Sequence, residues 1–196
     1  MQMSAWTTQI EAKWQAKWYA ARINEAERDA RPKFMIIFAY PGLTGYLHVG
    51  HMRGYTYVDG IGRYKRMCGY NVLFPLGTHA TGNGAISLAN RIKARDPKTV
   101  DYLLANGCPE DMISHLTEPM DVVNFFNEVY QNQYWRRFGF LADWRRFTST
   151  TNPDYGRFIQ WQFRKLHDAG LLIQKPYFAP ACVECGPVAI DASETD

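Results

Sequence analysis

The chain lacks long apolar runs, and none of its segments approaches the roughly 20 apolar residues that a membrane span needs. Its first residues, Met1–Trp6, lack the charged start and apolar core of a secretory signal peptide. Cysteine is scarce: the chain has four, two of them at Cys-x-x-Cys spacing, which fits a reducing compartment better than a disulfide scaffold. These absences predict a cytoplasmic protein that makes no contact with a membrane.

A strong excess of charge of one sign is also missing. The formal net charge is +3, which is too small to argue for nucleic-acid binding by itself. What the chain does have is 196 residues, of which 46% are hydrophobic and 15% aromatic. That is enough for about one globular domain with a substantial core.

The order of elements predicts half of a nucleotide-binding unit. An amphipathic pattern indicates a helix from Thr8 to about Arg28, and the apolar run Lys33–Tyr40 indicates a buried parallel strand. A second helix is expected from about His48 to Cys68, followed by a capping glycine and a short strand over Asn71–Pro75. Strand, helix and strand in this order form one parallel crossover.

The turn Pro41–His51 joins the first strand to the second helix and carries two histidines three residues apart. A helix start presents unpaired N–H groups to anions, and ligands of open α/β sheets gather at the carboxyl ends of strands. His48 and His51 would share one helix face and donate to phosphate oxygens, and Gly50 would let a flat purine approach the backbone. The alternatives are half of a zinc site or two polar residues on an exposed face.

A second glycine-rich turn, Gly77–Gly84, follows the second strand. Because sequential parallel strands end at the same edge of a sheet, we expect this turn beside the first one, with His79 and Thr81 offering hydrogen bonds. The alternative is an ordinary loop in which Thr81 caps the next helix.

The rest of the chain offers fewer candidates for chemistry. Residues from Ala85 to about Arg137 are expected to be a helical scaffold. The run Asp143-Trp144-Arg145-Arg146 is either a basic turn that grips RNA or, as we favour, a packed tryptophan beside a surface ion pair. A helix over Tyr155–Ala169 should end at Gly170. Its expected inner positions are Phe158, Ile159, Trp161, Gln162 and Leu166.

Cys182 and Cys185 have the spacing of a zinc knuckle, which lets two thiolates meet one metal ion. They supply two of the four ligands, and His167 is a third candidate on sequence distance alone. A thioredoxin-like redox pair is the weaker alternative, because that motif normally opens a helix.

Taken in order, these segments resemble the class I aminoacyl-tRNA synthetases, and among them the leucyl enzymes of archaeal type. His48-Val49-Gly50-His51 is similar to the HIGH signature of the family, and the turn at His79, the run at Asp143 and the cysteine pair resemble further family segments. The resemblance implies an α/β fold with a Rossmann-like parallel sheet, the first half of that catalytic domain, with a helical insertion and a terminal zinc-knuckle-like segment. It predicts an N-terminal helix over 1–31, an ATP- and amino-acid-binding domain over 32–175 with the insertion at about 85–137, and the start of a connective insertion over 176–196.

The implied activity is that of the N-terminal catalytic part of a leucine–tRNA ligase, which activates leucine with ATP and Mg²⁺ for transfer to tRNA(Leu). The resemblance implies that His48 and His51 are catalytic, that these two and Gly50 bind ATP, and that Tyr40 and His79 bind the amino acid. Cys182 and Cys185 would then bind Zn²⁺.

The family's lysine loop, Lys-Met-Ser-Lys-Ser, and the second half of its sheet are missing from the sequence. We therefore expect the remaining synthetase domains or a partner chain to supply that loop, and we expect self-association through uncovered apolar surface. Three alternatives remain: a fragment that binds ATP or tRNA without catalysis, a synthetase for isoleucine, valine or methionine, and a small adenylyl- or cytidylyltransferase.

Overall fold

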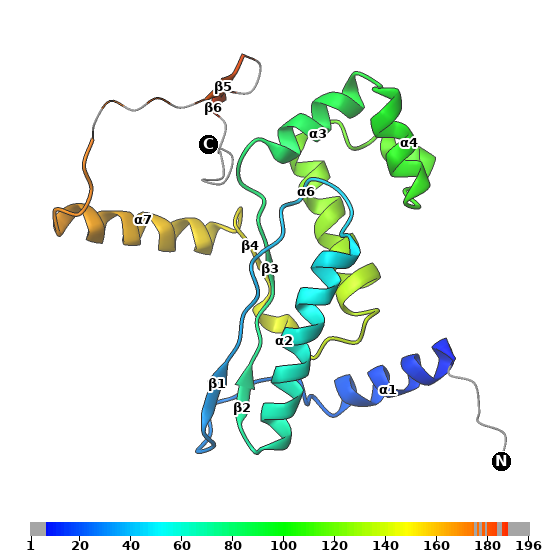
Figure 1. Cartoon of the computed structure of the whole chain (residues 1–196), viewed down its shortest axis with the longest axis vertical. Coiled ribbons are helices and arrows are strands. Elements are labelled where there is room, and N and C mark those ends of the chain that lie inside the picture. Colours follow the sequence, from blue (N-terminus) through cyan, green and yellow to red (C-terminus); the bar gives the residue numbers. More distant parts are fainter. Residues whose placement is uncertain (1–6, 175, 177, 179, 184–185, 188–196) are drawn as a thin grey trace. The chain divides into compact units, whose positions relative to one another are not determined.

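The computed structural model describes residues 7–174, 176, 178, 180–183 and 186–187 (Figure 1). Its backbone contacts divide the chain into two compact units. The first unit contains Met1–Tyr40, Leu47–Gly77 and Val129–Phe147, and the second contains Pro41–Tyr46, Thr78–Glu128 and Thr148–Asp196.

A parallel strand pair and one helix form the frame of the first unit. β1 (Lys33–Met35) pairs with β2 (Asn71–Leu73) in parallel, with Lys33 opposite Asn71, and α2 (Val49–Met67) connects them (Figure 1). Gly69, just beyond the end of α2, has φ +82°, as a capping glycine should. The predicted strand–helix–strand order is therefore confirmed.

Two elements of this unit are shorter and more exposed than predicted. The first helix, α1 (Thr8–Ala20), ends well before Arg28 and has no buried residue. β1 covers only the start of the predicted strand over 33–40, and its Met35 is 61% exposed. The prediction of a buried strand was wrong because such burial needs cover on both faces of the sheet, which the described residues do not provide.

The core of the first unit is aromatic. The fully buried ring of Tyr55 on α2 lies 5.3 Å from that of Trp135, at the end of the π-helix η1 (Val129–Trp135). Buried Asp59 accepts hydrogen bonds from Nε of Arg63, at 2.6 Å, and from the backbone N–H of Leu141, at 2.8 Å. α2 is thereby held to the segment that follows η1.

A buried carboxylate explains the Asp-Trp-Arg-Arg run. Asp143 has no exposed surface, whereas Trp144 in the short helix η2 (Trp144–Arg146) is partly exposed. The Asp143 side chain accepts hydrogen bonds from Arg145, at 2.8 and 2.9 Å, from Arg146, at 3.2 Å, and from the backbone N–H of Ala26, at 3.1 Å. The run is thus a structural anchor, as favoured above, but its buried member is the aspartate.

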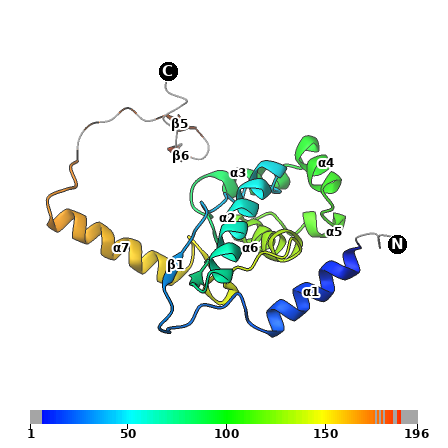
Figure 2. The same cartoon turned by 60° about the horizontal axis from the view of Figure 1, so that its bottom comes forward.

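The second unit combines a short strand pair with helices. Thr78 of β3 (Gly77–Thr78) accepts a hydrogen bond from the N–H of Thr150, next to β4 (Thr148–Ser149), its partner strand. The predicted helical scaffold is confirmed, and α3 and α6 pack side by side (Figure 2). The helices are α3 (Gly84–Lys93), α4 (Pro97–Ala105), α5 (Glu110–Ile113) and α6 (Pro119–Glu128).

The last helix, α7 (Pro153–Asp168), begins after Asn152, whose side chain accepts from the N–H of Asp154, and ends before Gly170, which has φ +68°. The helix was predicted correctly, but its predicted inner positions were wrong, since no residue of α7 is buried. β5 (Ala181–Cys182) and β6 (Gly186–Pro187) form a small antiparallel pair. Across the part of the chain that the structure describes, no helix has the length and apolar character to cross a membrane.

Candidate functional site

The start of α2 is built around His48. Its side chain caps the helix, because Nδ1 accepts a hydrogen bond from the N–H of Gly50 at 3.1 Å. An Nδ1 that accepts carries no proton, so a neutral His48 ring holds its proton on Nε2. One imidazole therefore satisfies a free helix N–H and keeps a donor for a ligand at the same time.

His51 lies one turn further along α2, with its ring centre 4.0 Å from that of His48. Its Nδ1 is buried and has no hydrogen-bond partner among the described residues. Burial lowers the pKa of His51, and the charge of a protonated His48 lowers it further. Because a buried N–H without an acceptor is costly, we assign the proton of the neutral ring to Nε2. The two predicted donors are thus brought together within one turn of α2.

Gly50 packs closely against the ring of His48. A Cβ at position 50 would lie 3.0 Å from both Cε1 and Nδ1 of that ring, tighter than ordinary van der Waals contact. The sequence predicts that the glycine at position 50 lets a purine approach the backbone. The close contact with the His48 ring is a second reason for a glycine here, and it involves no ligand.

A groove of about 500 Å³ opens beside His48 within the first unit. Arg53 and Thr56 of α2 contribute polar groups, and Tyr57 and Phe138 contribute exposed rings. Arg53 was not among the predicted site residues. Its spacing from His48 is not the three or four residues of a shared helix face, so the pattern gave no signal for it.

The lowered pKa of His51 predicts a pH effect on stability. Below its ordinary pKa of 6.5, the unfolded chain takes up a proton at this residue more readily than the folded chain does. The folded state should therefore lose stability as the pH falls from 7.5 to 5.5, and His51→Gln should lose less. Urea unfolding of both proteins at the two pH values measures this, and equal losses would contradict it.

The second predicted turn lies beside the first one in the second unit. His79 and Gly42 form a parallel bridge in which the N–H of Leu43 donates to the carbonyl of His79 at 3.2 Å. The side chain of His79 is exposed, and its Nε2 lies 3.2 Å from Oγ1 of Thr81. Thr81 does not cap α3, whose N-cap is Asn83, so that alternative was wrong.

The cavity between these turns has a volume of only about 40 Å³. That is room for about one water molecule and not for an amino-acid side chain such as that of leucine. The turn residues Leu43, Thr44, His79 and Thr81 line it. Tyr40, the other predicted amino-acid contact, is half-buried in the first unit. The two predicted contacts thus belong to different units.

Tyr102 of α4 is a residue that the sequence reasoning missed. Its hydroxyl accepts a hydrogen bond from the N–H of Tyr46 at 2.8 Å, and a Cβ at Gly45 would lie 2.7 Å from that hydroxyl. α4, which the sequence predicted to be part of a helical scaffold, therefore supports the end of the Pro41–Tyr46 turn. Nothing in the spacing of a lone tyrosine on a helix could have revealed this.

Replacing Tyr102 by phenylalanine should remove that acceptor. We expect Tyr102→Phe to lower the free energy of unfolding by about 0.5–1.5 kcal/mol. Tyr57→Phe, a change at an exposed tyrosine of α2, is the control and should stay within about 0.5 kcal/mol of the parent. Chemical unfolding of the three proteins provides the comparison, and equal stability of both variants would count against the support role.

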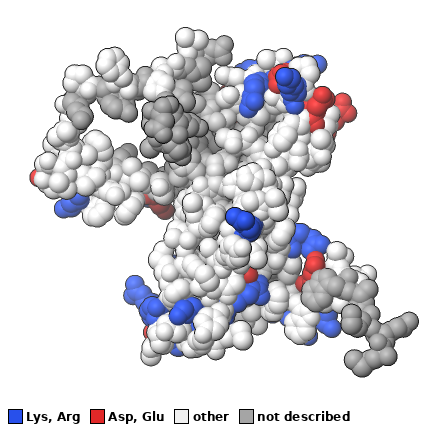
Figure 3. Space-filling model, in the orientation of Figure 1, with Lys and Arg blue, Asp and Glu red and all other residues white. Residues whose placement is uncertain are grey.

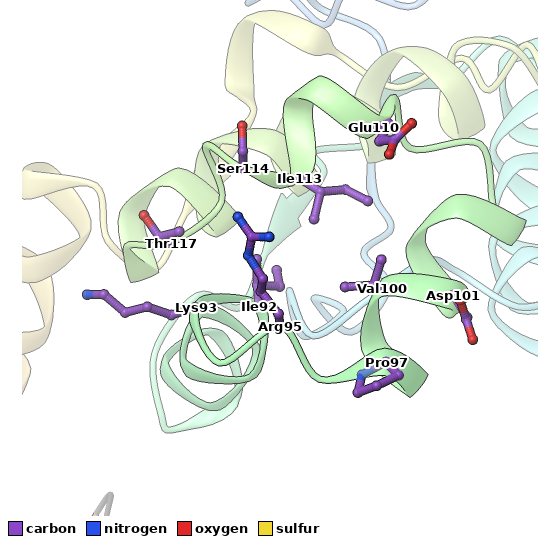
Figure 4. Close-up of a pocket in the computed structure, with 10 residues that line it drawn as sticks. All are labelled: Ile92, Lys93, Arg95, Pro97, Val100, Asp101, Glu110, Ile113, Ser114 and Thr117. Atoms are coloured by element: carbon purple, nitrogen blue, oxygen red, sulfur yellow. The ribbon is translucent and has the colours of Figure 1, made fainter.

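A larger hollow of about 620 Å³ lies in the second unit and contains none of the predicted site residues. Arg95 and the apolar side chains of Ile92, Val100 and Ile113 meet there (Figure 4). Lys93, at its rim, forms an ion pair of 2.9 Å with Glu118.

The predicted zinc ligands fall largely outside the described residues. Cys185 is not described, and Cys182 is described only through its backbone in β5. The Nδ1 atom of His167, the third candidate ligand, lies 3.5 Å from Oδ1 of Asp168. The described residues include no cluster of three or more His, Cys, Asp or Glu side chains suited to a metal ion. Zinc binding by Cys182 and Cys185 stays a prediction.

Comparisons with known proteins agree on one family. The model of the family "tRNA synthetases class I (I, L, M and V)" matches residues 9–193. Leucine–tRNA ligases are similar to the chain: that of Methanosarcina mazei is 44% identical over 85% of this chain, and that of Methanothermobacter thermautotrophicus is 42% identical over 90%. The matched parts make up 17% and 19% of those relatives, so the chain spans less than a fifth of their length.

A solved structure shares the fold. The chain matches a LeuRS of Agrobacterium radiobacter K84, crystallised as a ternary complex with tRNA and LeuAMS, with a TM-score of 0.57 and 25% identity. The match covers 82% of this chain and 18% of the other. It agrees with the α/β architecture and the parallel strands described above.

Proposed function

Because the chain belongs to the class I tRNA synthetases (I, L, M and V), as its motifs predicted, we propose that it supplies the ATP- and leucine-binding part of a leucine–tRNA ligase. The observation that carries the proposal is the start of α2, where the rings of His48 and His51 lie 4.0 Å apart at a helix N-terminus. A helix N-terminus attracts phosphate, and the Nε2–H groups of His48 and His51 add donors there.

The proposed reaction is amino-acid adenylation. A carboxylate oxygen of leucine forms a bond to the α-phosphorus of ATP, the bond to the bridging oxygen breaks, and pyrophosphate leaves with the electron pair. No protein nucleophile is needed, because positioning and electrostatic stabilisation carry such transfers. His48 and His51 would stabilise the charge that develops on the phosphate oxygens, Gly50 would complete the ATP site, and Mg²⁺ would enter bound to ATP.

Leucine is the proposed amino acid because the similar ligases at 42–44% identity act on leucine by name. Tyr40 and His79 would contact it, with His79 as a neutral acceptor, since an imidazolium would repel the ammonium group of the substrate. Isoleucine, valine and methionine are the alternatives, because one methylene group changes affinity by only about 1–3 kcal/mol. The leucyl group would then pass to tRNA(Leu).

The small cavity at His79 adds a requirement. Its volume of about 40 Å³ is too small for leucine, so leucine could occupy this cavity only if the turns at Thr44 and Thr81 separated. Binding of leucine should therefore change the surroundings of both turns, which amide exchange of this segment would report.

A second candidate is a fragment that binds ATP or tRNA without catalysis. In the resembled family the lysines of a Lys-Met-Ser-Lys-Ser loop meet the ATP phosphates, and the 196 residues of this chain contain no such loop. Remaining synthetase domains or a partner chain would supply the loop, and the Cys182–Cys185 pair would hold Zn²⁺. The third alternative, a small adenylyl- or cytidylyltransferase, is overturned by the family match over residues 9–193.

Amino-acid-dependent ATP–pyrophosphate exchange tests the proposal, with leucine, isoleucine, valine and methionine compared side by side. Exchange with leucine above the other three supports leucine adenylation. If another amino acid leads, the specificity is wrong. If a folded sample binds ATP but shows no exchange with any of the four, the chain is a binding fragment.

A further inference from the structure

The hollow of about 620 Å³ in the second unit has the size of a small-molecule site but no role in the proposed adenylation. Such sites are concave and mostly apolar, carry a few polar groups that orient the ligand, and have volumes of roughly 300–1,000 Å³. The side chains that line the hollow all fall between positions 92 and 117, on α3, α4, α5 and the segments that join and follow them. Its shape therefore depends on one continuous stretch of the second unit.

Three aliphatic side chains give the hollow an apolar floor. Ile92 and Ile113 are only 4% and 7% exposed, and Val100 is half-buried. The side chains of Val100 and Ile113 face each other across the hollow (Figure 4). Because helix packing already orders these side chains, a ligand that covers them immobilises few additional groups of the protein. The floor therefore favours a ligand with an apolar body.

Arg95 places a cation at one side of the floor. The N–H of Arg95 donates to the carbonyl of Ile92 and that of Asp96 to the carbonyl of Arg91, both at 2.9 Å, so α3 ends in a Schellman motif. Arg95 takes the left-handed position of this motif, with φ +53°, which fixes where its side chain leaves the backbone. The guanidinium reaches towards Ser114 (Figure 4) and has no hydrogen bond or ion pair among the described residues. A free guanidinium suits a carboxylate, which it binds through two parallel hydrogen bonds.

The other charges of the hollow restrict the ligand further. Basic and acidic side chains lie close together over α3 and α4 (Figure 3). Lys93 is neutralised by Glu118, whereas Asp101 and Glu110 line the side away from Arg95 and have no ion pair among the described residues (Figure 4). These carboxylates would repel a dianion such as phosphate. A ligand with one carboxylate and one ammonium group matches the charges at both sides.

We propose that this hollow binds a short apolar peptide with free termini. The carboxylate of the peptide pairs with Arg95, its ammonium group pairs with Glu110, and its side chains cover the apolar floor. A single apolar amino acid carries the same two charges but fills only a small part of the volume. Because none of the residues proposed for adenylation lines the hollow, peptide binding needs neither ATP nor catalysis.

The test follows the methyl signals of Ile92 and Ile113 by NMR in the full chain, with the dipeptide Val-Val as the probe. The methyl signal of the exposed Ile159 on α7 reports non-specific binding. We expect Val-Val to shift the first two signals saturably and to leave the third unchanged. Val-Val amide lacks the carboxylate and N-acetyl-Val-Val lacks the ammonium group. Each should bind about three- to fivefold more weakly, because pairs of exposed charges contribute modestly.

Two arginines near the end of α3 provide matched variants. Arg95→Gln should bind Val-Val and its amide equally, because the partner of the carboxylate is gone. Arg91→Gln, at an exposed position of α3 outside the hollow, should keep the preference for the free carboxylate. Glu110→Gln should bind Val-Val and N-acetyl-Val-Val equally.

Three results would overturn the proposal: no saturable shift of the Ile92 and Ile113 signals, equal affinity of the parent for Val-Val and both capped forms, or shifts of Ile159 as large as those in the hollow. A carboxylate preference that persists in Arg95→Gln would do the same. Arg95→Gln should fold normally, since the guanidinium makes no hydrogen bond among the described residues. If it does not, the three peptides compared on the parent still decide the matter.

Discussion

His51→Ala is expected to lower leucine-dependent ATP–pyrophosphate exchange by about 10²–10³-fold while leaving the fold intact. Loss of one preorganised donor to a developing oxyanion typically costs that much. The Nδ1 of His51 has no hydrogen-bond partner among the described residues, so the substitution breaks no hydrogen bond at that atom, although it removes the ring contact with His48. Exchange rates of the parent and the variant, taken on samples of equal circular dichroism, provide the measurement.

The matched control is His115→Ala, which removes an exposed histidine from the second unit and should leave the rate unchanged. If exchange by His51→Ala stays within about threefold of the parent, His51 does not stabilise the reacting phosphate. If His115→Ala falls equally, the loss reflects general damage to the chain.

His48 needs a different substitution because it also caps α2. Asparagine is a good helix cap but has no group that reaches as far as the imidazole Nε2. His48→Asn should therefore keep the stability of the helix and lose exchange, whereas His48→Ala should lose both. Comparing the two variants separates the cap from the chemistry.

The start of α2 was predictable from the sequence because every signal there is local. A helix N-terminus, a glycine at position 50 and two histidines three residues apart fix the geometry within one turn. The neighbouring positions of the two glycine-rich turns, which the structure shows as the pairing of Gly42 with His79, also followed, since sequential parallel strands end at one sheet edge. Local periodicity and one rule of topology were sufficient for both.

What the sequence could not predict depends on contacts between distant segments. The apolar pattern of α7 predicted burial, yet pattern alone does not say whether the covering surface is part of the same chain. The bond between Tyr102 and the N–H of Tyr46 spans 56 residues. The carboxylate of Asp143 meets the N–H of Ala26 across 117 residues. No rule of residue spacing predicts contacts between residues so far apart in the sequence.

That long-range carboxylate carries the largest expected effect on stability. Asp143→Ala should lower the free energy of unfolding by about 2–4 kcal/mol, because it removes several charge-assisted hydrogen bonds and leaves the N–H of Ala26 without its acceptor. Denaturant unfolding of the parent and the variant measures the loss. Asp154→Ala is the control: its ion pair with Arg157 joins two largely exposed side chains and should contribute less than about 1 kcal/mol.

The pH dependence of the same group provides a second readout. Burial alone would raise the pKa of Asp143, but hydrogen bonds from Arg145, the Ala26 N–H and Arg146 outweigh it and hold the pKa below the usual 3.8. A carboxyl whose pKa is lowered by folding adds stability above its unfolded pKa, and that stability disappears as the pH falls through the folded value. The difference in the free energy of unfolding between the parent and Asp143→Ala should therefore become smaller as the pH is lowered from 6 to 3. If that difference stayed constant, Asp143 would stabilise the fold through its packing and not through its charge. This result would contradict the interpretation that its carboxylate links the segments at Ala26 and Arg145 by charge-assisted hydrogen bonds.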